Sequence, residues 1–133
     1  MASNELVTPG PIHRRWSVSR HKDIVERYIE GFRRSDHTLI LSCLTEDVVW
    51  VLHGYKTLQG KAAFDAEIKN PGFQGSPALT IDRLIEEGHS VVATGGGSVV
   101  RKGGERQRFV FCEMFTFTGD AISRLEAYHL WVS

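Results

Sequence analysis

The sequence predicts one α+β domain in which helices come first and a run of antiparallel strands follows. Apolar residues recur at helical spacing before residue 45, whereas apolar and polar residues alternate after residue 78. Short turns that contain glycine separate these later segments. Strands joined by tight turns form an antiparallel meander, and helices followed by strands are typical of α+β proteins. A chain of 133 residues can bury a hydrophobic core in one domain.

Residues 1–18 are expected to form an irregular arm, because Pro9, Gly10 and Pro11 disfavour regular structure. The domain itself is expected over residues 19–133. Ser19 can cap a first helix, since a serine hydroxyl satisfies a free backbone N–H at a helix start. The apolar stripe of this helix consists of Ile24, Val25, Tyr28, Ile29 and Phe32.

Two further helices and one strand are expected before the region that contains strands alone. Ser35 or Asp36 can cap a short second helix. Residues 45–54 are rich in β-branched and aromatic side chains, which predicts a strand. Residues 60–69 predict a third short helix, which the Asn-Pro-Gly sequence at residues 70–72 would end.

The rest of the chain predicts four strands, over residues 78–88, 89–104, 105–120 and 121–133. Three consecutive glycines, Gly95–Gly97, fall inside the second of them. Glycine weakens a strand but permits a bulge or a sharp bend, which a sheet that wraps around helices needs. The alternative is a loop that cradles phosphate, but no Lys-Ser/Thr and no helix follow the glycines. We therefore expect a bend.

The charge balance argues against nucleic acid or a membrane surface as a partner. Lys and Arg together number 16, as do Asp and Glu, so the formal net charge is zero. Cys43 and Cys112 have neither metal-site nor redox-motif spacing, and we expect free thiols in a reducing cytoplasm. No apolar run is long enough to cross a bilayer, and the first residues lack the apolar stretch of a secretory signal.

The predicted strand over residues 105–120 places one carboxyl group among phenyl rings. Alternation puts Glu113 on the same face as Phe109, Phe111, Phe115 and Phe117. If this face is concave, burial favours the protonated acid, which can donate a hydrogen bond to a substrate oxygen or act as a general acid. The alternative is that Glu113 pairs with an arginine or lies at a wet rim.

The last predicted strand carries a second candidate for acid–base chemistry. Leu125, Ala127, His129 and Trp131 share one of its faces. Histidine exchanges protons near neutral pH, so His129 is either an acid or base, or a histidine with satisfied hydrogen bonds. The other histidines lack the spacing of metal ligands and no Gly-x-Ser-x-Gly occurs, so we expect neither a metal site nor a serine nucleophile.

The order and spacing of five segments resemble the nuclear transport factor 2-like superfamily, in particular its SnoaL-like and ketosteroid-isomerase-like branches. The segments are IVERYIEGFRRSD, LTEDVVWVLHG, LQGKAAFDAEI, IEEGHSVVATG and FVFCEMFTFTGDAISRLEAY, within residues 19–132. The resemblance implies a cone-shaped, strongly curved antiparallel sheet wrapped around three N-terminal helices, a cystatin-like roll. It also implies a deep pocket and commonly a homodimer, here through the outer face of the sheet.

The resemblance also assigns candidate catalytic residues. Tyr28 falls where a ketosteroid isomerase has its oxyanion-hole tyrosine, and Glu113 falls where that enzyme has its protonated oxyanion-hole aspartic acid. The catalytic base of the isomerase falls at Leu52, which cannot move a proton, and His53 beside it would face the other side of the strand. SnoaL-like cyclases use acid–base side chains from neighbouring strands, which Glu113 and His129 resemble in type.

The resemblance places further side chains around the pocket, and the small ones leave room for a ligand. The expected lining consists of Phe32, Trp50, Leu52, Phe64, Gly96, Ser98, Phe111, Phe115, Leu125 and Ala127. We expect a pocket for a small apolar oxygenated compound and an acid–base enzyme without a cofactor, of isomerase, cyclase, dehydratase or epoxide hydrolase type. Its catalytic residues would be Tyr28, Glu113 and His129. A ligand-binding protein without turnover and a dimeric interaction module with an idle pocket are the alternatives.

Overall fold

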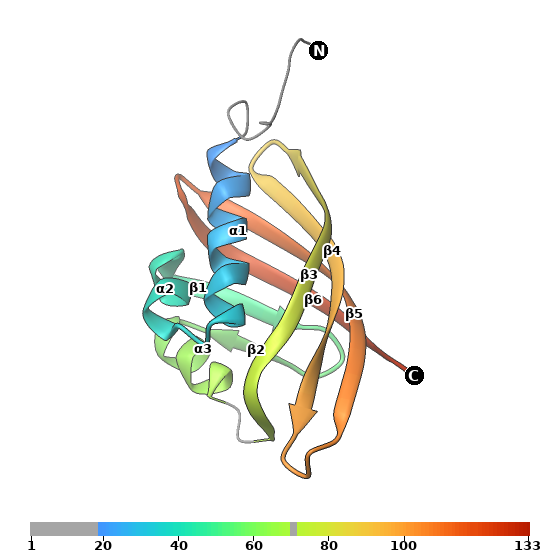
Figure 1. Ribbon diagram of the computed structural model, residues 1–133. Helices are drawn as coiled ribbons and strands as arrows, with labels where there is room; N and C mark the ends of the chain where they lie inside the picture. Colours follow the sequence, from blue (N-terminus) through green and yellow to red (C-terminus); the bar gives the residue numbers. More distant parts are fainter. Residues whose placement is uncertain (1–18, 70–71) are drawn as a thin grey trace.

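A curved sheet of six strands wraps around helix α1 in the computed structural model (Figure 1). The structure describes residues 19–69 and 72–133, so the predicted arm over residues 1–18 and part of the predicted helix end at residues 70–72 lie outside the described residues. The helices are α1 (Arg20–Arg33), α2 (His37–Ser42) and α3 (Lys61–Ile68). The strands are β1 (Leu44–Leu52), β2 (Lys56–Gln59), β3 (Phe73–Glu87), β4 (Ser90–Arg101), β5 (Arg106–Thr118) and β6 (Ala121–Val132). Within the described ranges, no helix is long and apolar enough to cross a membrane.

Polar side chains begin the first two helices. The hydroxyl of Ser19 accepts a hydrogen bond from the backbone N–H of Lys22 at 2.9 Å, as predicted. At the start of α2, the carboxylate of Asp36 accepts from the N–H of Leu39 at 3.0 Å, so Asp36 is the cap and Ser35 is not. Ser35 adopts a positive φ of 51° in the turn before it. The two caps therefore fix where α1 and α2 begin.

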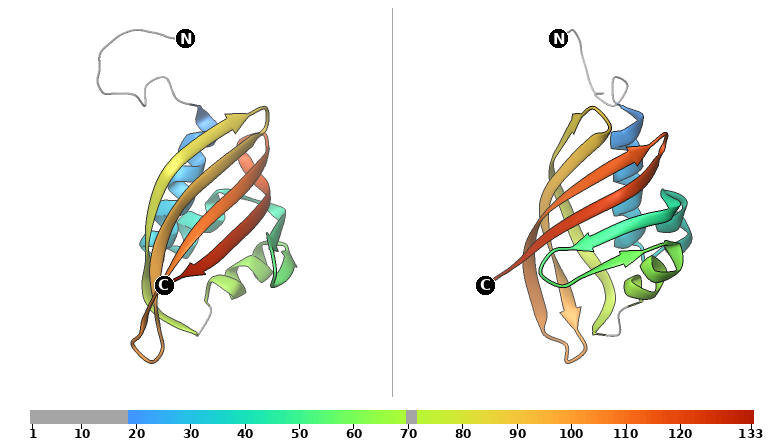
Figure 2. Two further views of the ribbon diagram at one scale, coloured as in Figure 1. Left: turned by 90° about the vertical axis from the view of Figure 1, so that its right-hand side faces the viewer. Right: turned by 180° about the vertical axis from the view of Figure 1, so that it is seen from behind.

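The strand order is β2-β1-β6-β5-β4-β3, and the last four strands form the predicted antiparallel meander (Figure 2). Two features differ from the expectation. Strand β2, which the sequence analysis did not predict, pairs with β1 at one edge of the sheet. Strand β1 also pairs with β6 in parallel, so the sheet is antiparallel at every neighbour but this one. Alternation identifies the two faces of a strand, but it carries no information about which strand lies beside it.

The inner face of the sheet follows the predicted alternation in β5 and β6. Glu113 pairs directly with Ala127, and Phe111 pairs with His129. Directly paired residues of antiparallel strands point to the same face. Burial agrees with this assignment, since every second residue from Phe109 to Phe117 is buried. The predicted phenyl-lined face of β5 therefore faces the helices.

The glycine run bends the sheet by letting two strands approach closely. A Cβ atom at Gly95 would overlap the carbonyl oxygen of Thr80 in β3 and would lie 2.8 Å from the Phe111 ring. A Cβ atom at Gly97 would overlap the carbonyl oxygen of Ala78 in the same way. The structure thus agrees with the bend predicted for this run rather than with a phosphate loop.

An aromatic core joins α1 to the sheet. The Tyr28 ring packs edge-on against Phe32, Phe64 and Phe115, with centroid distances of 5.1, 6.2 and 5.3 Å. Trp50 stacks on Phe64 with centroids 3.9 Å apart. Edge-on and offset-stacked rings are favourable arrangements of the aromatic quadrupoles. This cluster holds Tyr28 and Trp50 rigidly beside the cavity described next.

Candidate functional site

The concave side of the sheet and the three helices enclose a cavity of about 720 Å³. This volume lies in the range that small-molecule sites of proteins occupy. Most of the wall is apolar and aromatic, with Phe32, Trp50 and Phe109 among its residues. Glu113 and His37 are among the polar residues. The cavity therefore combines apolar walls with a small number of polar groups.

The structure brings most of the predicted site residues to this cavity. Those that line it are Tyr28, Phe32, Trp50, Leu52, Phe111, Glu113, Ala127 and His129. Phe64, Phe115 and Leu125 do not line it but are fully buried in the core beside it. They support the wall from behind and leave its surface to Tyr28 and Trp50.

Two predicted residues of β4 lie on the other side of the sheet. Gly96 pairs with Val110, and Ser98 pairs with Arg108, whereas Glu113 pairs with Ala93. Because side chains alternate along a strand, this difference of one position puts Gly96 and Ser98 on the outer face. There the hydroxyl of Ser98 accepts a hydrogen bond from Arg106 Nη1 at 2.8 Å. The inner face of β4 is formed by its odd-numbered residues instead.

Glu113 and His129 form a hydrogen-bonded pair on the sheet wall of the cavity. Glu113 Oε2 lies 3.0 Å from His129 Nε2, across neighbouring strands β5 and β6. Glu113 is 9% exposed, whereas the side chain of His129 is 44% exposed. The carboxyl group thus pairs with a histidine rather than an arginine, and the histidine connects it to solvent. A carboxyl–imidazole pair can take up or release a proton at either partner.

The second oxygen of Glu113 lacks a hydrogen-bond partner. Glu113 Oε1 is buried, and neither it nor the indole Nε1 of Trp50 makes a hydrogen bond within the described residues. A buried polar atom without a partner costs about 1–3 kcal/mol. The last torsion of a glutamate side chain is soft, and a ligand reaches the buried Oε1 only when the carboxyl group turns about it. The hydroxyl of a bound molecule would supply the missing partner.

Tyr28 is fixed as a neutral phenol. Burial raises the pKa of Tyr28 well above its ordinary value, and electrostatic interaction with Glu113 and Cys43 raises it further. The hydroxyl therefore keeps its proton and remains available as a hydrogen-bond donor. A donor next to a carboxyl group is an arrangement that can bind a carbonyl or hydroxyl oxygen.

Leu52 occupies the cavity wall, and the neighbouring histidine does not replace the missing base. His53 reaches the rim of the cavity, but its Nε2 lies 3.2 Å from Glu126 and its ring stacks on Tyr128 at 4.1 Å. Glu126 and Tyr128 alternate with Ala127 and belong to the outer face. The imidazole of His53 is therefore engaged outside the cavity.

Several lining residues were not predicted from the sequence. His37 at the start of α2, Tyr55 in the β1–β2 turn, and Phe73 at the start of β3 all line the cavity. No local sequence pattern identifies these residues, because they belong to three separate segments that come together around the cavity only in the folded chain. Among residues 19–69 and 72–133, no group of three or more His, Cys, Asp or Glu side chains could hold a metal ion.

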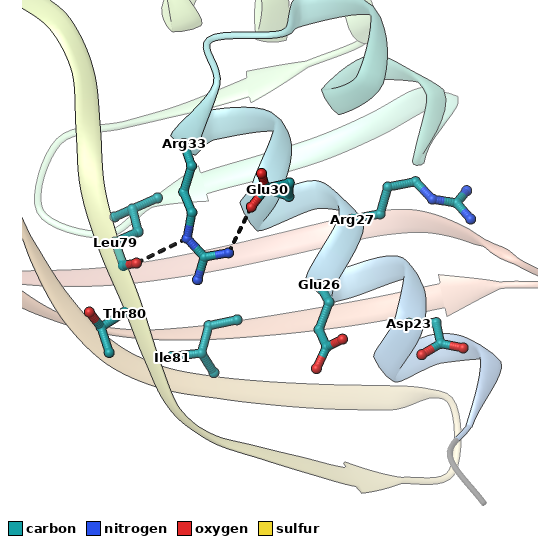
Figure 3. Close-up of a pocket in the computed structure, with 8 residues that line it drawn as sticks. All are labelled: Asp23, Glu26, Arg27, Glu30, Arg33, Leu79, Thr80 and Ile81. Atoms are coloured by element: carbon teal, nitrogen blue, oxygen red, sulfur yellow. Dashed lines mark hydrogen bonds and ion pairs between the residues drawn. The ribbon is translucent and has the colours of Figure 1, made fainter. Parts of the chain in front are cut away.

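A second hollow, of about 860 Å³, lies open between α1 and β3 (Figure 3). Its helical side carries charged residues such as Glu26, Arg27 and Glu30. Arg33 crosses the hollow, donating from Nε to the carbonyl oxygen of Leu79 and from Nη1 to Glu30, both at 3.0 Å. These charges face a broad open surface, and none of the buried atoms without a partner belongs to its lining. We therefore take the enclosed cavity as the candidate site.

Residues 25–125 match the family model of the SnoaL-like domain. A comparison with curated proteins found no match. Similar solved structures include an NTF2-like protein of unknown function from Burkholderia pseudomallei, 24% identical with a TM-score of 0.78, over 84% of this chain and 91% of that chain. TerC, co-crystallised with polyporic acid, is 25% identical with a TM-score of 0.74, over 83% and 91% of the two chains. An LEH-like epoxide hydrolase of M. tuberculosis is 17% identical with a TM-score of 0.75, over 84% and 83%.

Proposed function

Because the chain belongs to the family of SnoaL-like domains, we propose that its cavity binds a small, mostly apolar, oxygenated organic molecule. The protein then performs acid–base chemistry on this molecule without a cofactor. The observation that carries the proposal is the Glu113–His129 pair in the wall of an aromatic cavity. Glu113 is buried there with one oxygen unpaired, which is costly for the fold and useful for a ligand.

In the proposed reaction, three side chains have separate roles. Tyr28 donates a hydrogen bond to a substrate oxygen and stabilises negative charge that develops on it. Glu113 and His129 exchange a proton with the substrate, and the half-exposed imidazole returns it to solvent. Isomerisation that needs a carboxylate base at position 52 is disfavoured, because Leu52 stands there. Cyclisation, dehydration and epoxide opening are compatible with these groups.

Two of the similar structures support a small organic ligand. TerC was crystallised with polyporic acid, and the M. tuberculosis protein is described as an epoxide hydrolase. The second candidate function is binding of the same class of ligand without turnover. It is favoured by Leu52, which stands at the position of the isomerase's catalytic base and cannot move a proton.

We expect aromatic alcohols and ketones to stabilise the protein against heat. A ligand that binds the folded chain alone raises its stability by about 2.7 kcal/mol at a concentration of 100 Kd. Thermal unfolding with a panel of such compounds, together with a crystal structure of the best binder, measures this directly. Sugar phosphates of similar size are the matched negative set. A cavity closed by Trp50 and the phenylalanines, with no stabilisation by any compound, would contradict the proposal.

Incubation of the stabilising compounds with the protein separates the enzyme from the binder. If the chain is an enzyme, chromatography with mass detection finds a product, and His129→Ala slows its formation. If every stabilising compound is recovered unchanged, the binding function is the correct one.

We also propose a homodimer through the outer face of the sheet, where Val110 and Leu130 pair across β5 and β6 and are exposed. Leu130 is 65% exposed, so Leu130→Glu is expected to convert the dimer into a monomer with little change in stability. Light scattering at micromolar concentration measures the mass. Tyr55→Glu is the control, because Tyr55 is 66% exposed but lies in the β1–β2 turn. A monomeric wild type, or a dimeric Leu130→Glu variant, would rule out this interface.

Three further predictions concern the domain bounds, the partners and the location of the protein. We still predict one domain over residues 19–133 preceded by an irregular arm, and we predict that nucleic acid is not a partner. A cytoplasmic location is supported by two free cysteines, Cys43 and Cys112. Burial raises the pKa of the Cys43 thiol, which makes that thiol a weak nucleophile.

A further inference from the structure

A second histidine–carboxylate pair lies on the helical side of the same cavity. His37 is the first residue of α2, and Asp65 lies in the middle of α3. His37 Nδ1 is 2.7 Å from Asp65 Oδ1. Both side chains are partly buried, with 32% and 27% of their surfaces exposed. The pair therefore sits nearer to solvent than Glu113 does.

Asp65 holds the His37 ring in one orientation. The hydrogen bond from His37 and a second contact, from Lys69 Nζ at 3.1 Å, lower the pKa of the Asp65 carboxyl group. Asp65 is therefore a carboxylate at neutral pH and accepts the proton of His37 Nδ1. A neutral imidazole that is protonated at Nδ1 carries its lone pair on Nε2.

The ring nitrogen of His37 that is left for a ligand is Nε2. His37 lines the cavity, whereas Asp65 does not. Nδ1 is thus bound by a residue outside the lining, and Nε2 lies on the opposite edge of the ring. Within the described part of the chain, Asp65 is the one hydrogen-bond partner found for this ring. Nε2 is available to a ligand.

The two pairs share a cavity with aromatic side chains. Glu113 and His129 lie on the sheet wall, His37 lies on the helical wall, and Phe32 and Trp50 are among the apolar residues of the same cavity. The rings of Phe32 and Trp50 pack against each other with centroids 6.5 Å apart. A molecule that contacts both the Glu113–His129 pair and His37 is therefore suited to this cavity if it has an apolar aromatic body and two oxygen functions.

We infer that the ligand is an aromatic compound with two hydroxyl groups, one bound by the Glu113–His129 pair and the other by His37 Nε2. This inference rests on the proposed function, because it assigns the ligand class of the same cavity. His37 acts here as an acceptor for the hydroxyl proton, and Asp65 positions it.

Paired probes with one and two hydroxyl groups test the inference at two lengths. The probes are 2-naphthol with 2,6-dihydroxynaphthalene, and 4-hydroxybiphenyl with 4,4′-dihydroxybiphenyl. Titration calorimetry on the whole chain gives the affinity of each. At one of the two lengths, the second hydroxyl is expected to tighten binding by about 3- to 10-fold, the effect of one hydrogen bond.

Variants of the second pair should remove this gain, so that in each variant the two-hydroxyl probe binds no more tightly than its one-hydroxyl partner. His37→Phe keeps the ring shape without the nitrogen, and Asp65→Ala releases the imidazole if the first variant fails to fold. His21→Phe is the matched control. His21 also pairs with a carboxylate, Glu86 at 3.3 Å, but it does not line the cavity.

The outcomes separate this inference from the proposal it rests on. If the one-hydroxyl probes bind and the second hydroxyl gives no gain, or a gain that His37→Phe and Asp65→Ala retain, the pair merely ties α2 to α3 and the inference is wrong. If no probe binds the wild type, the proposed function fails and this inference fails with it.

Discussion

Replacing Gly95 by alanine is expected to lower the free energy of unfolding by about 3 kcal/mol, the upper end of what overpacking usually costs. The new Cβ atom would overlap the carbonyl oxygen of Thr80, a backbone atom of β3. It would also lie 2.8 Å from the Phe111 ring, which forms part of the cavity wall. Backbone atoms in a paired strand cannot turn aside as a flexible side chain can. The strands must separate, or the sheet must lose its bend.

Urea unfolding followed by circular dichroism measures this change. Gly103→Ala is the matched control, because nothing lies within 4 Å of a Cβ atom there and its φ is not positive. That variant should stay within about 0.5 kcal/mol of the wild type. Equal urea midpoints for the two variants would show that β3 and β4 do not approach each other this closely.

Replacing Glu113 by methionine is expected to change stability and ligand affinity in opposite directions. Methionine has a similar shape and removes the buried oxygen that lacks a partner, so the free energy of unfolding should rise by about 1 kcal/mol. The partly exposed imidazole of His129 can turn to water when it loses its carboxyl partner. Hydrogen bonds to charged groups contribute about 1.5–3 kcal/mol, so affinity for an oxygenated ligand should fall by about 10- to 100-fold.

Two further variants separate the causes of these changes. Glu113→Gln keeps the shape and one carbonyl oxygen but loses the charge, and it should fall between the wild type and methionine in affinity. His129→Ala removes the hydrogen-bond partner of the carboxyl group and should lower stability. Thermal melts measure the stability of each variant, and titration calorimetry measures its ligand affinity. A methionine variant that is less stable, yet binds as the wild type does, would remove Glu113 from the site.

Sequence patterns predicted the faces of β5 because a buried strand alternates between two chemically different surfaces, whereas in β6 alternation separated two faces and the resemblance chose the inner one. Phenyl rings on one side of β5 and Arg108 and Thr116 on the other made the assignment clear. In β4 both sides carry small residues, so the resemblance alone decided, and it placed Gly96 and Ser98 on the wrong face. A register shift near Phe117 brings Ile122 to the inner face as well, which plain alternation from Leu125 does not predict.

The candidate site was predictable where one strand or one helix supplies the residues. Glu113, His129 and Tyr28 each lie on a face that periodicity or the resemblance identified, and all three line the cavity. His37 and Asp65 were not predictable, because they lie on two short helices separated by β1 and β2. Their contact depends on how those helices pack, and no periodic pattern encodes that packing.

The parallel pairing of β1 with β6 has a consequence for how the chain reaches its native state. Leu44 in β1 pairs with Ile122 in β6, so β1 cannot complete its pairing until the ribosome has synthesised β6, much later in the chain. Until then β1 presents one free row of backbone donors and acceptors, since β2 covers only its other edge. Pairings so distant along the chain close slowly, and an unpaired edge invites association with other nascent chains. The strand that completes the ligand cavity by contributing His129 is thus also the strand that ends this period of exposure.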